Sequence, residues 1–467
     1  MHTIEAIIAR ITSGKSSAVS EVRAALERAD TAKDKNIFIS MTAERALERA
    51  AEIDVRLQKG ESVGRLAGVP FAAKDNFLAF GAATTAAADI LSNFEAPLQA
   101  TAIEKLEAEG AICIGKTNLD AFAHGGSTEN SAYGPTKNAV DDTKVAGGSS
   151  GGSAVAVALG IVPFALGSDT GGSIRQPASF NGVVGIKPTY GMVSRYGVVA
   201  MASSTDCIGC FANTVSDTEL VTGILSGRDA HDMTTLEDYF TPSEHTPAQK
   251  IGLIKEFMSE GVDDDVRACV NEYAEQLRSA GHIVEEVDLP IAKYALAMYY
   301  IIVPAEVSSN LARYDGVRYG RRAEGSTSLD ALYDKSRGEG FMAENKRRIM
   351  IGSYVLSSGY FDAYYLKAQK ARTLLIEAFD ELFKTYDALL GPVTPSPAFG
   401  LGENTADPIK MYLADIMTVP ASLAGLPALS VPGGIATNGL PVGVQLIGKQ
   451  KSDADLLALA ASMEKVS

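Results

Sequence analysis

Residues 147–177, GGSSGGSAVAVALGIVPFALGSDTGGSIRQP, hold two glycine- and serine-rich turns separated by an apolar segment. A glycine-rich turn that enters a helix directs several backbone N–H groups at one point, where they can hold a hydroxyl or an anion. Either turn alone could bind a phosphate. The second turn would direct its N–H groups toward an oxyanion beside a serine Oγ. The pair therefore favours acyl transfer, with Thr170, Gly171 and Gly172 as candidate oxyanion donors.

The serines of these turns, Ser149 and Ser173, are preceded by a lysine, Lys74, in GVPFAAKDN (68–76). The usual histidine base does not stand beside either serine. A lysine that acts through a bridging serine is an alternative way to activate a hydroxyl. The lysine must be neutral for this role, and burial among apolar neighbours would penalise its ammonium form. The apolar neighbours in the sequence are Val69, Phe71 and Phe77. The three polar residues together point to acyl transfer on an amide.

Residues 66–199 resemble the amidase signature family, whose glycine- and serine-rich core carries a Ser-Ser-Lys triad in the same order and local context. The resemblance implies that Ser173 is the nucleophile, Ser149 the bridging serine and Lys74 the base. It also implies an α/β fold with a large mixed β-sheet and helices on both faces. We expect one amidase domain over residues 1–467, with a helical lead-in at 1–60 and the signature core at 62–210.

Within that family the sequence is similar to the A subunits of tRNA-dependent amidotransferases. Three runs carry this similarity: GSTENSAYGPTKN (126–138), MASSTDCIG (201–209) and SYVLSSGYFDAYYLKAQKARTLL (353–375). The similarity implies that glutamine is the substrate, held at its α-carboxylate by Arg348 and at its α-ammonium by Asp415. Arg347 is an alternative to Arg348. The other substrate contacts that it implies are Gly126, Ser127 and Tyr299.

The same similarity implies two partners, a B subunit that binds tRNA and activates the acyl group with ATP and Mg²⁺, and a small C subunit. No cofactor is then expected in this chain. The 467-residue sequence carries 42 basic and 57 acidic residues, a net charge of −15, which opposes nonspecific binding to tRNA or a membrane. We expect tRNA to be held by the partner. Whether that tRNA carries glutamate, aspartate or both is left open by the sequence, and a stand-alone amidase for small or lipophilic amides is the alternative.

Several motifs compete with this interpretation. Residues 110–117, GAICIGKT, match the P-loop pattern, but Ala111–Ile114 is itself strand-like and a taut strand cannot wrap a phosphate. Cys207 and Cys210 form a CxxC without a second ligand pair, so two buried thiols are favoured over a metal or redox site. His124 in AFAHGGSTENS could serve Ser173 as a base, although a place in the pocket wall is favoured.

The rest of the sequence alternates strand-like and helical patterns. Strands are predicted at 111–114, 251–254, 283–287, 428–431 and 443–447, and helices at 99–109, 266–277 and from 452 onward. Residues 227–249 are expected to form a long surface loop. Residues 360–365 could line an ammonia route or lie at the surface. The start of the sequence does not have the pattern of a signal peptide and no apolar stretch is long enough to span a membrane, so a cytoplasmic protein is expected.

Overall fold

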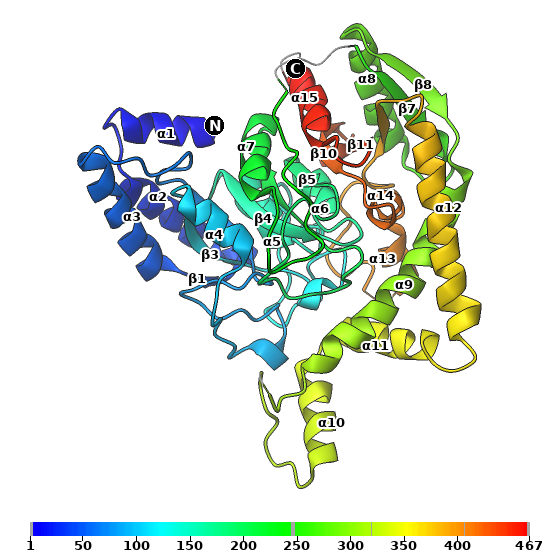
Figure 1. Cartoon of the computed structure of the whole chain (residues 1–467), viewed down its shortest axis with the longest axis horizontal. Coiled ribbons are helices and arrows are strands. Elements are labelled where there is room, and N and C mark those ends of the chain that lie inside the picture. The colour runs from blue at the N-terminus through cyan, green and yellow to red at the C-terminus, as the bar shows by residue number, and fades with distance from the viewer. Residues whose placement is uncertain (1–2, 244–247, 319, 406, 465–467) are drawn as a thin grey trace.

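A computed structural model describes residues 3–243, 248–318, 320–405 and 407–464. In this described part, eleven strands form one mixed sheet in the order β1-β3-β2-β4-β6-β5-β10-β11-β9-β7-β8 (Figure 1). The strands are β1 (Phe38–Met41), β2 (Pro70–Lys74), β3 (Ile112–Thr117), β4 (Phe164–Asp169), β5 (Val184–Lys187), β6 (Cys207–Ala212), β7 (Lys250–Ile254), β8 (Ile283–Val287), β9 (Ala388–Pro392), β10 (Ala428–Ile435) and β11 (Pro441–Gly448).

Helices cover both faces of the sheet, as the sequence predicts. The α-helices of the described part are α1 (Ile4–Thr12), α2 (Ala18–Thr31), α3 (Ala43–Gln58), α4 (Thr101–Ala108), α5 (Gly151–Ala158), α6 (Arg175–Asn181), α7 (Val215–Leu225), α8 (Asp264–Ser279), α9 (Ala295–Asn310), α10 (Leu329–Gly340), α11 (Ala343–Val355), α12 (Lys367–Leu382), α13 (Pro408–Leu413), α14 (Val419–Leu423) and α15 (Asp453–Glu464). Hydroxyl side chains cap several of them, such as Ser17 at α2 and Thr214 at α7.

The central strands are buried on both faces, because helices pack on each side of the sheet and successive residues of a strand point to opposite sides. Phe71 packs in a core that includes α1, α4, α7, α8 and α15, whereas its neighbour Ala72 packs in a second core with α2, α3 and α5. Farther along the sheet, Leu390 belongs to the first core and Leu389 to a third, built on α9, α12 and α14. This double burial explains why the strands read as apolar runs rather than as alternating ones.

Most of the predicted elements are confirmed, with shifts of a few residues at their ends. The predicted strand 283–287 coincides with β8, and 251–254 lies within β7. The described part of the lead-in, residues 3–60, contains the helices α1, α2 and α3, and it also contains β1, which the sequence did not predict. Phe38–Met41 pairs antiparallel with β3, so that segment becomes an edge strand of the sheet. Thr42 before α3 does not cap the helix with its side chain; its hydroxyl donates to the carbonyl of Cys113 instead.

The P-loop match is a strand, as predicted from the sequence. β3 extends through Gly115 and Lys116 to Thr117, so the residues that would bind a phosphate lie inside the sheet. Lys116 is fully buried and its Nζ lies 2.6 Å from Asp75 Oδ1. A lysine held in this way is not available to a nucleotide.

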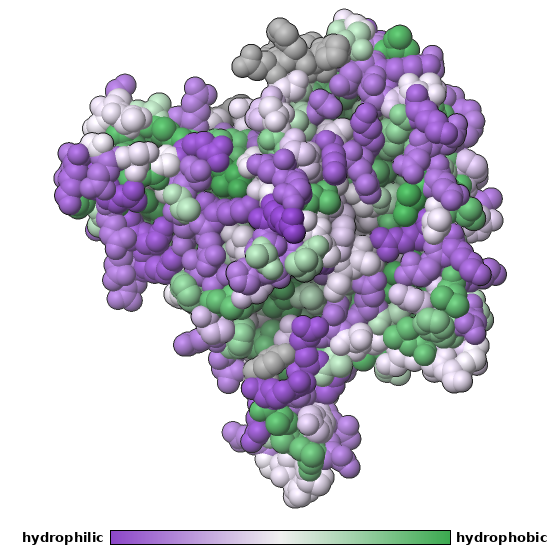
Figure 2. Space-filling model, in the orientation of Figure 1, coloured by the Kyte–Doolittle hydropathy of each residue, from purple (hydrophilic) through white to green (hydrophobic). Residues whose placement is uncertain are grey.

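Helix α10 extends away from the body of the molecule at the bottom of Figure 1. Residues 227–243 and 248–249 contain no helix or named strand, as predicted for a loop, and residues 244–247 lie outside the described residues. Tyr360, Phe361 and Tyr364, in the segment for which two roles were open, are 38–42% exposed. Figure 2 shows hydrophilic residues over much of one face. None of the described helices is both long and apolar enough to cross a membrane.

Candidate active site

The sheet brings Lys74 and the turn with Ser173 to one edge. Lys74 is the last residue of β2, and the turn follows β4, which pairs with β2 in parallel. The carboxyl ends of parallel strands meet at the same edge of a sheet, where α/β proteins commonly bind ligands. Ser149 precedes α5, which packs on both strands. The sequence therefore folds so that Lys74 meets Ser149, and the turn with Ser173 lies at the same edge of the sheet.

Lys74 is completely buried, as predicted, and has two serine neighbours. Its Nζ lies 2.7 Å from Ser149 Oγ, 2.9 Å from Ser168 Oγ and 3.4 Å from the Ser168 carbonyl oxygen. Burial lowers the pKa of Lys74 to about 7, against the opposing effect of Asp120, Asp169 and Asp206. A neutral amine can donate both hydrogens to Ser168 and keep its lone pair for the Ser149 hydroxyl. The contacts of Lys74 thus suit a base.

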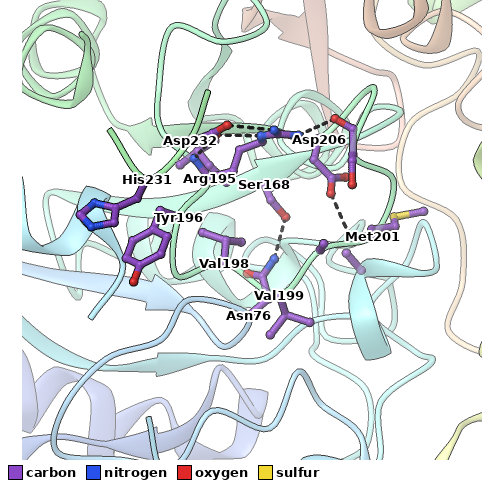
Figure 3. Close-up of a pocket in the computed structure, with 14 residues that line it drawn as sticks. Asn76, Ser168, Arg195, Tyr196, Val198, Val199, Met201, Asp206, His231 and Asp232 are labelled. Atoms are coloured by element: carbon purple, nitrogen blue, oxygen red, sulfur yellow. Dashed lines mark hydrogen bonds and ion pairs between the residues drawn. The ribbon is translucent and has the colours of Figure 1, made fainter. Parts of the chain in front are cut away.

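Ser168 is a contact of Lys74 that the sequence did not single out. Its hydroxyl also accepts a hydrogen bond from Asn76 Nδ2 at 3.0 Å. Figure 3 shows both residues in the wall of a cavity of about 210 Å³. The same wall holds Asp206, which accepts from the Thr170 hydroxyl, and the ion pair of Arg195 with Asp232. This cavity therefore reaches the hydrogen bonds of Lys74 and of residues 170–173, the candidate oxyanion turn.

Ser173 is 8% exposed, and its hydroxyl makes no hydrogen bond to any described residue. The N–H groups of Gly171, Gly172 and Ser173 likewise donate to none of the described residues. The turn that carries them is anchored by Arg175, whose Nη2 lies 2.9 Å from Asp169 Oδ1 in a fully buried ion pair. An open hydroxyl beside free N–H donors is the arrangement that acyl transfer requires.

Two glycines in this turn leave no room for a side chain. A Cβ on Gly171 would lie 2.7 Å from the Tyr299 hydroxyl oxygen, which places Tyr299 against the turn. Gly172 has a φ of +147°, and a Cβ there would lie 2.3 Å from Thr418 Oγ1. Tyr299 on α9 and Thr418 before α14 therefore form the wall behind the candidate oxyanion donors, and Gly is required at both positions.

Gly126, Ser127 and Arg348 line one cavity of about 210 Å³, distinct from that of Figure 3. Asp120 holds the loop that carries the first two, because its carboxylate accepts hydrogen bonds from the N–H groups of Ser127, Thr128 and Asn130. The carbonyl of Gly126 accepts from Gln176 on α6. Asp120 is fully buried, and this burial raises its pKa to about 6. No local pattern in the sequence marks Asp120 for this role.

The two adjacent arginines differ in how far their side chains are exposed. Both side chains line the cavity, but that of Arg347 is 45% exposed, whereas that of Arg348 is 4% exposed. Arg348 is thus the better placed of the two to bind a carboxylate in this cavity.

Asp415 lies between the cavity and the oxyanion turn. A Cβ on Gly126 would be 3.8 Å from Asp415 Oδ2, and one on Gly172 would be 3.4 Å from Asp415 Oδ1. Its side chain caps neither neighbouring helix, since Asp407 caps α13 and Thr418 is the N-cap residue of α14. Asp415 keeps some exposure, but desolvation by the surrounding protein still raises its pKa to about 8, against the lowering effect of Arg348. A ligand cation beside it would stabilise its charged form.

The other candidates from the sequence, His124, Cys207 and Cys210, have surroundings that are ordinary for buried side chains. His124 lies in the cavity wall, as favoured from the sequence, and its Nδ1 is 3.0 Å from Asn345 Nδ2 rather than paired with Ser173. Burial lowers its pKa well below the usual range. Cys207 and Cys210 are buried free thiols three residues apart on β6, so they point to opposite faces. Among the described residues, no cluster of His, Cys, Asp and Glu could hold a metal ion.

Known proteins match this chain over most or all of its length. The Amidase family model matches residues 21–457. The A subunit of the glutamyl-tRNA(Gln) amidotransferase of Thermosynechococcus vestitus is 50% identical, with 100% of this chain and 98% of the relative covered. The corresponding A subunit of Koribacter versatilis is 51% identical, with 92% and 90% covered.

A solved structure gives the same result. The crystal structure of the A subunit of the glutamyl-tRNA(Gln) amidotransferase of Thermotoga maritima is 41% identical and has a TM-score of 0.81, with 100% of this chain and 94% of that chain covered. The resemblance to the amidase signature family and to its amidotransferase A subunits is thus confirmed over the whole chain, as is the α/β fold. On the family match, the relatives and the shared fold, this chain belongs to the amidase family.

Proposed function

We propose that this chain is the glutaminase subunit of a tRNA-dependent amidotransferase. The observation that carries the proposal is the 2.7 Å contact of Lys74 with Ser149 beside the oxyanion turn, next to a cavity that Arg348 and Asp415 flank. Glutamine is an amide with one anionic and one cationic group, which matches that pair of side chains. Tyr299, Gly126 and Ser127 complete the pocket.

In the proposed reaction, neutral Lys74 takes the proton of Ser149, and Ser149 takes the proton of Ser173. The Ser173 oxygen attacks the carboxamide carbon of glutamine, and the N–H groups of the turn formed by residues 170–173 stabilise the oxyanion. The relay returns a proton to the departing ammonia, which leaves a γ-glutamyl ester on Ser173. Water then hydrolyses the ester and releases glutamate.

The ammonia is proposed to pass to a B subunit that binds tRNA and activates the acyl group with ATP and Mg²⁺, while a small C subunit joins the complex. Glu-tRNA(Gln), Asp-tRNA(Asn) or both would be converted there, in the cytoplasm. The acidic composition of this chain, with a net charge of −15, supports a division of labour in which the partner holds the tRNA. No cofactor is assigned to the chain itself.

Ammonia release from glutamine tests this function. The chain alone is compared with the chain in complex with its tRNA-binding partner, ATP and mischarged tRNA, and the complex is expected to release ammonia much faster. A stand-alone amidase would instead hydrolyse simple amides without a partner and ignore glutamine in both settings. That result would also remove the proposed roles of Arg348 and Asp415. A noncatalytic scaffold would support transamidation from free ammonia yet show no glutaminase activity of its own.

The pH dependence of glutamine hydrolysis should follow two buried groups. Because the Lys74 pKa is about 7 and only the neutral amine is a base, kcat should fall about tenfold for each pH unit below 7. Because the Asp415 pKa is about 8 in the empty site, KM for glutamine should fall as the pH rises toward 8 and the carboxylate ionises. Steady-state kinetics between pH 5.5 and 8.5 measures both trends. A kcat that is flat across this range would contradict the assignment of Lys74 as the base.

A further inference from the structure

Glu344, near the start of α11, contacts both sides of the cavity that contains Arg348. Its Oε1 accepts a hydrogen bond from Arg348 Nε at 2.9 Å and another from the Tyr412 hydroxyl at 2.9 Å. Its Oε2 pairs with the more exposed Arg347. The side chain of Glu344 is only 13% exposed. One carboxylate thus joins α11 to α13, which lie 68 residues apart in the sequence at these contacts.

The contact with Glu344 decides which part of Arg348 is free. The Nε of Arg348 is occupied, whereas Nη1 and Nη2 donate to none of the described residues. The guanidinium carbon lies 5.3 Å from the Tyr300 ring centroid and 5.7 Å from that of Tyr412, which restrains its plane. A carboxylate is bound best by two parallel N–H groups of a fixed fork. Glu344 therefore presents the two terminal nitrogens, rather than the Nε edge, for a ligand.

The contact with Tyr412 extends this arrangement to Asp415. Tyr412 is three residues before Asp415, and the N–H of Asp415 donates to the Tyr412 carbonyl at 3.2 Å. The Tyr412 ring also stacks on Tyr300, with centroids 3.9 Å apart. Restraint of Tyr412 consequently restrains the turn that carries Asp415.

We infer that Glu344 is a positioning residue that sets the orientation of the Arg348 fork and, through Tyr412, its spacing from the Asp415 carboxylate. It thereby selects ligands in which one carbon atom carries both a carboxylate and an ammonium group. The inference rests on the proposed glutaminase function. It adds a residue that supports discrimination between glutamine, whose α-carboxylate and α-ammonium are both free, and a simple amide.

Variants of Glu344 in the full complex test the inference. Glu344→Ala should raise KM for glutamine about tenfold or more and leave kcat within about twofold, because the fork is misplaced but the triad is intact. Glu344→Gln keeps the shape and one acceptor, so a smaller rise of about threefold is expected. Tyr412→Phe removes one of the two contacts and should also raise KM about threefold. Lys346→Ala, on the exposed side of the same helix, is the control and should leave KM unchanged.

Butyramide, which lacks both α-substituents of glutamine, separates recognition from structural damage. Its hydrolysis at high concentration should be equal in wild type and Glu344→Ala. Equal losses on glutamine and butyramide would overturn the inference in favour of a structural role, and an unchanged KM for glutamine in both Glu344 variants would overturn it as well. If Glu344→Ala fails to fold, the KM of Glu344→Gln decides. A wild-type complex without glutaminase activity would overturn the proposed function itself, and the inference with it.

Discussion

Ser173→Ala is expected to lower glutamine hydrolysis by about 10⁴-fold or more, because the variant lacks the oxygen that forms the acyl-enzyme. Glutamine binding should persist, since Arg348 and Asp415 lie on other segments of the chain and the Ser173 hydroxyl donates to none of the described residues. The measurements are ammonia release for activity and isothermal titration calorimetry for glutamine binding. Loss of turnover with retained binding would identify Ser173 as the nucleophile.

The control for this experiment is Ser153→Ala. The Ser153 hydroxyl is also buried and donates to the Leu166 carbonyl at 2.8 Å, but it lies on α5 away from the oxyanion turn. Its removal should cost stability of about 1 kcal/mol and leave activity per folded molecule near that of the wild type. Full glutaminase activity in Ser173→Ala would refute the proposed mechanism.

Much of the fold follows from local patterns in the sequence. The strands β7 and β8 and the helix α8 between them are marked by apolar runs, a helical stripe and glycines at the boundaries, and all three are confirmed. The strand β1 was missed because Phe38–Met41 is a four-residue edge strand between helices. It is held by pairing with β3, which is more than 70 residues away. Such a tertiary contact leaves no periodic signal.

Some residues of the candidate site could likewise be predicted from local motifs, whereas others depend on contacts between distant segments. Lys74, Ser149 and Ser173 stand in short glycine-rich or strand-ending motifs, which have a recognisable local form. Ser168 is in one of those motifs, but its contact with Lys74 depends on the parallel pairing of β2 and β4. Glu344 could not be found from the sequence, because its partner Tyr412 is 68 residues away in an unrelated segment. Its i, i+4 relation to Arg348 is common on exposed helices and carries no information on function.

Lys74→Met should abolish glutamine hydrolysis almost as completely as Ser173→Ala, since methionine keeps an unbranched side chain but has no amine to accept a proton. Lys74→Arg should be equally inactive, because a guanidinium stays protonated at all accessible pH values. We expect losses of about 10³- to 10⁴-fold in kcat, measured by ammonia release. Neither residual activity should show the fall below pH 7 expected for the wild type. Substantial activity in Lys74→Met would point to a different base. His124 is the other candidate base that the sequence offers.

Stability should change in the opposite direction to activity, which separates a catalytic lysine from a structural one. The pKa of Lys74 is lowered from 10.5 to about 7 by burial, so folding removes a proton from it at pH values between these limits. The unfolded chain then binds more protons, and the wild type loses stability as the pH falls from about 10 to 7. Lys74→Met removes this penalty but also loses the hydrogen bonds of the amine. The net result should be a rise of roughly 2 kcal/mol in the free energy of unfolding at pH 7.

Lys187→Met is the matched control, because Lys187 is also fully buried with a lowered pKa but lies outside the site. Both variants should gain thermal stability, and only Lys74→Met should lose activity; destabilisation of Lys74→Met would show that the amine serves the fold rather than the reaction.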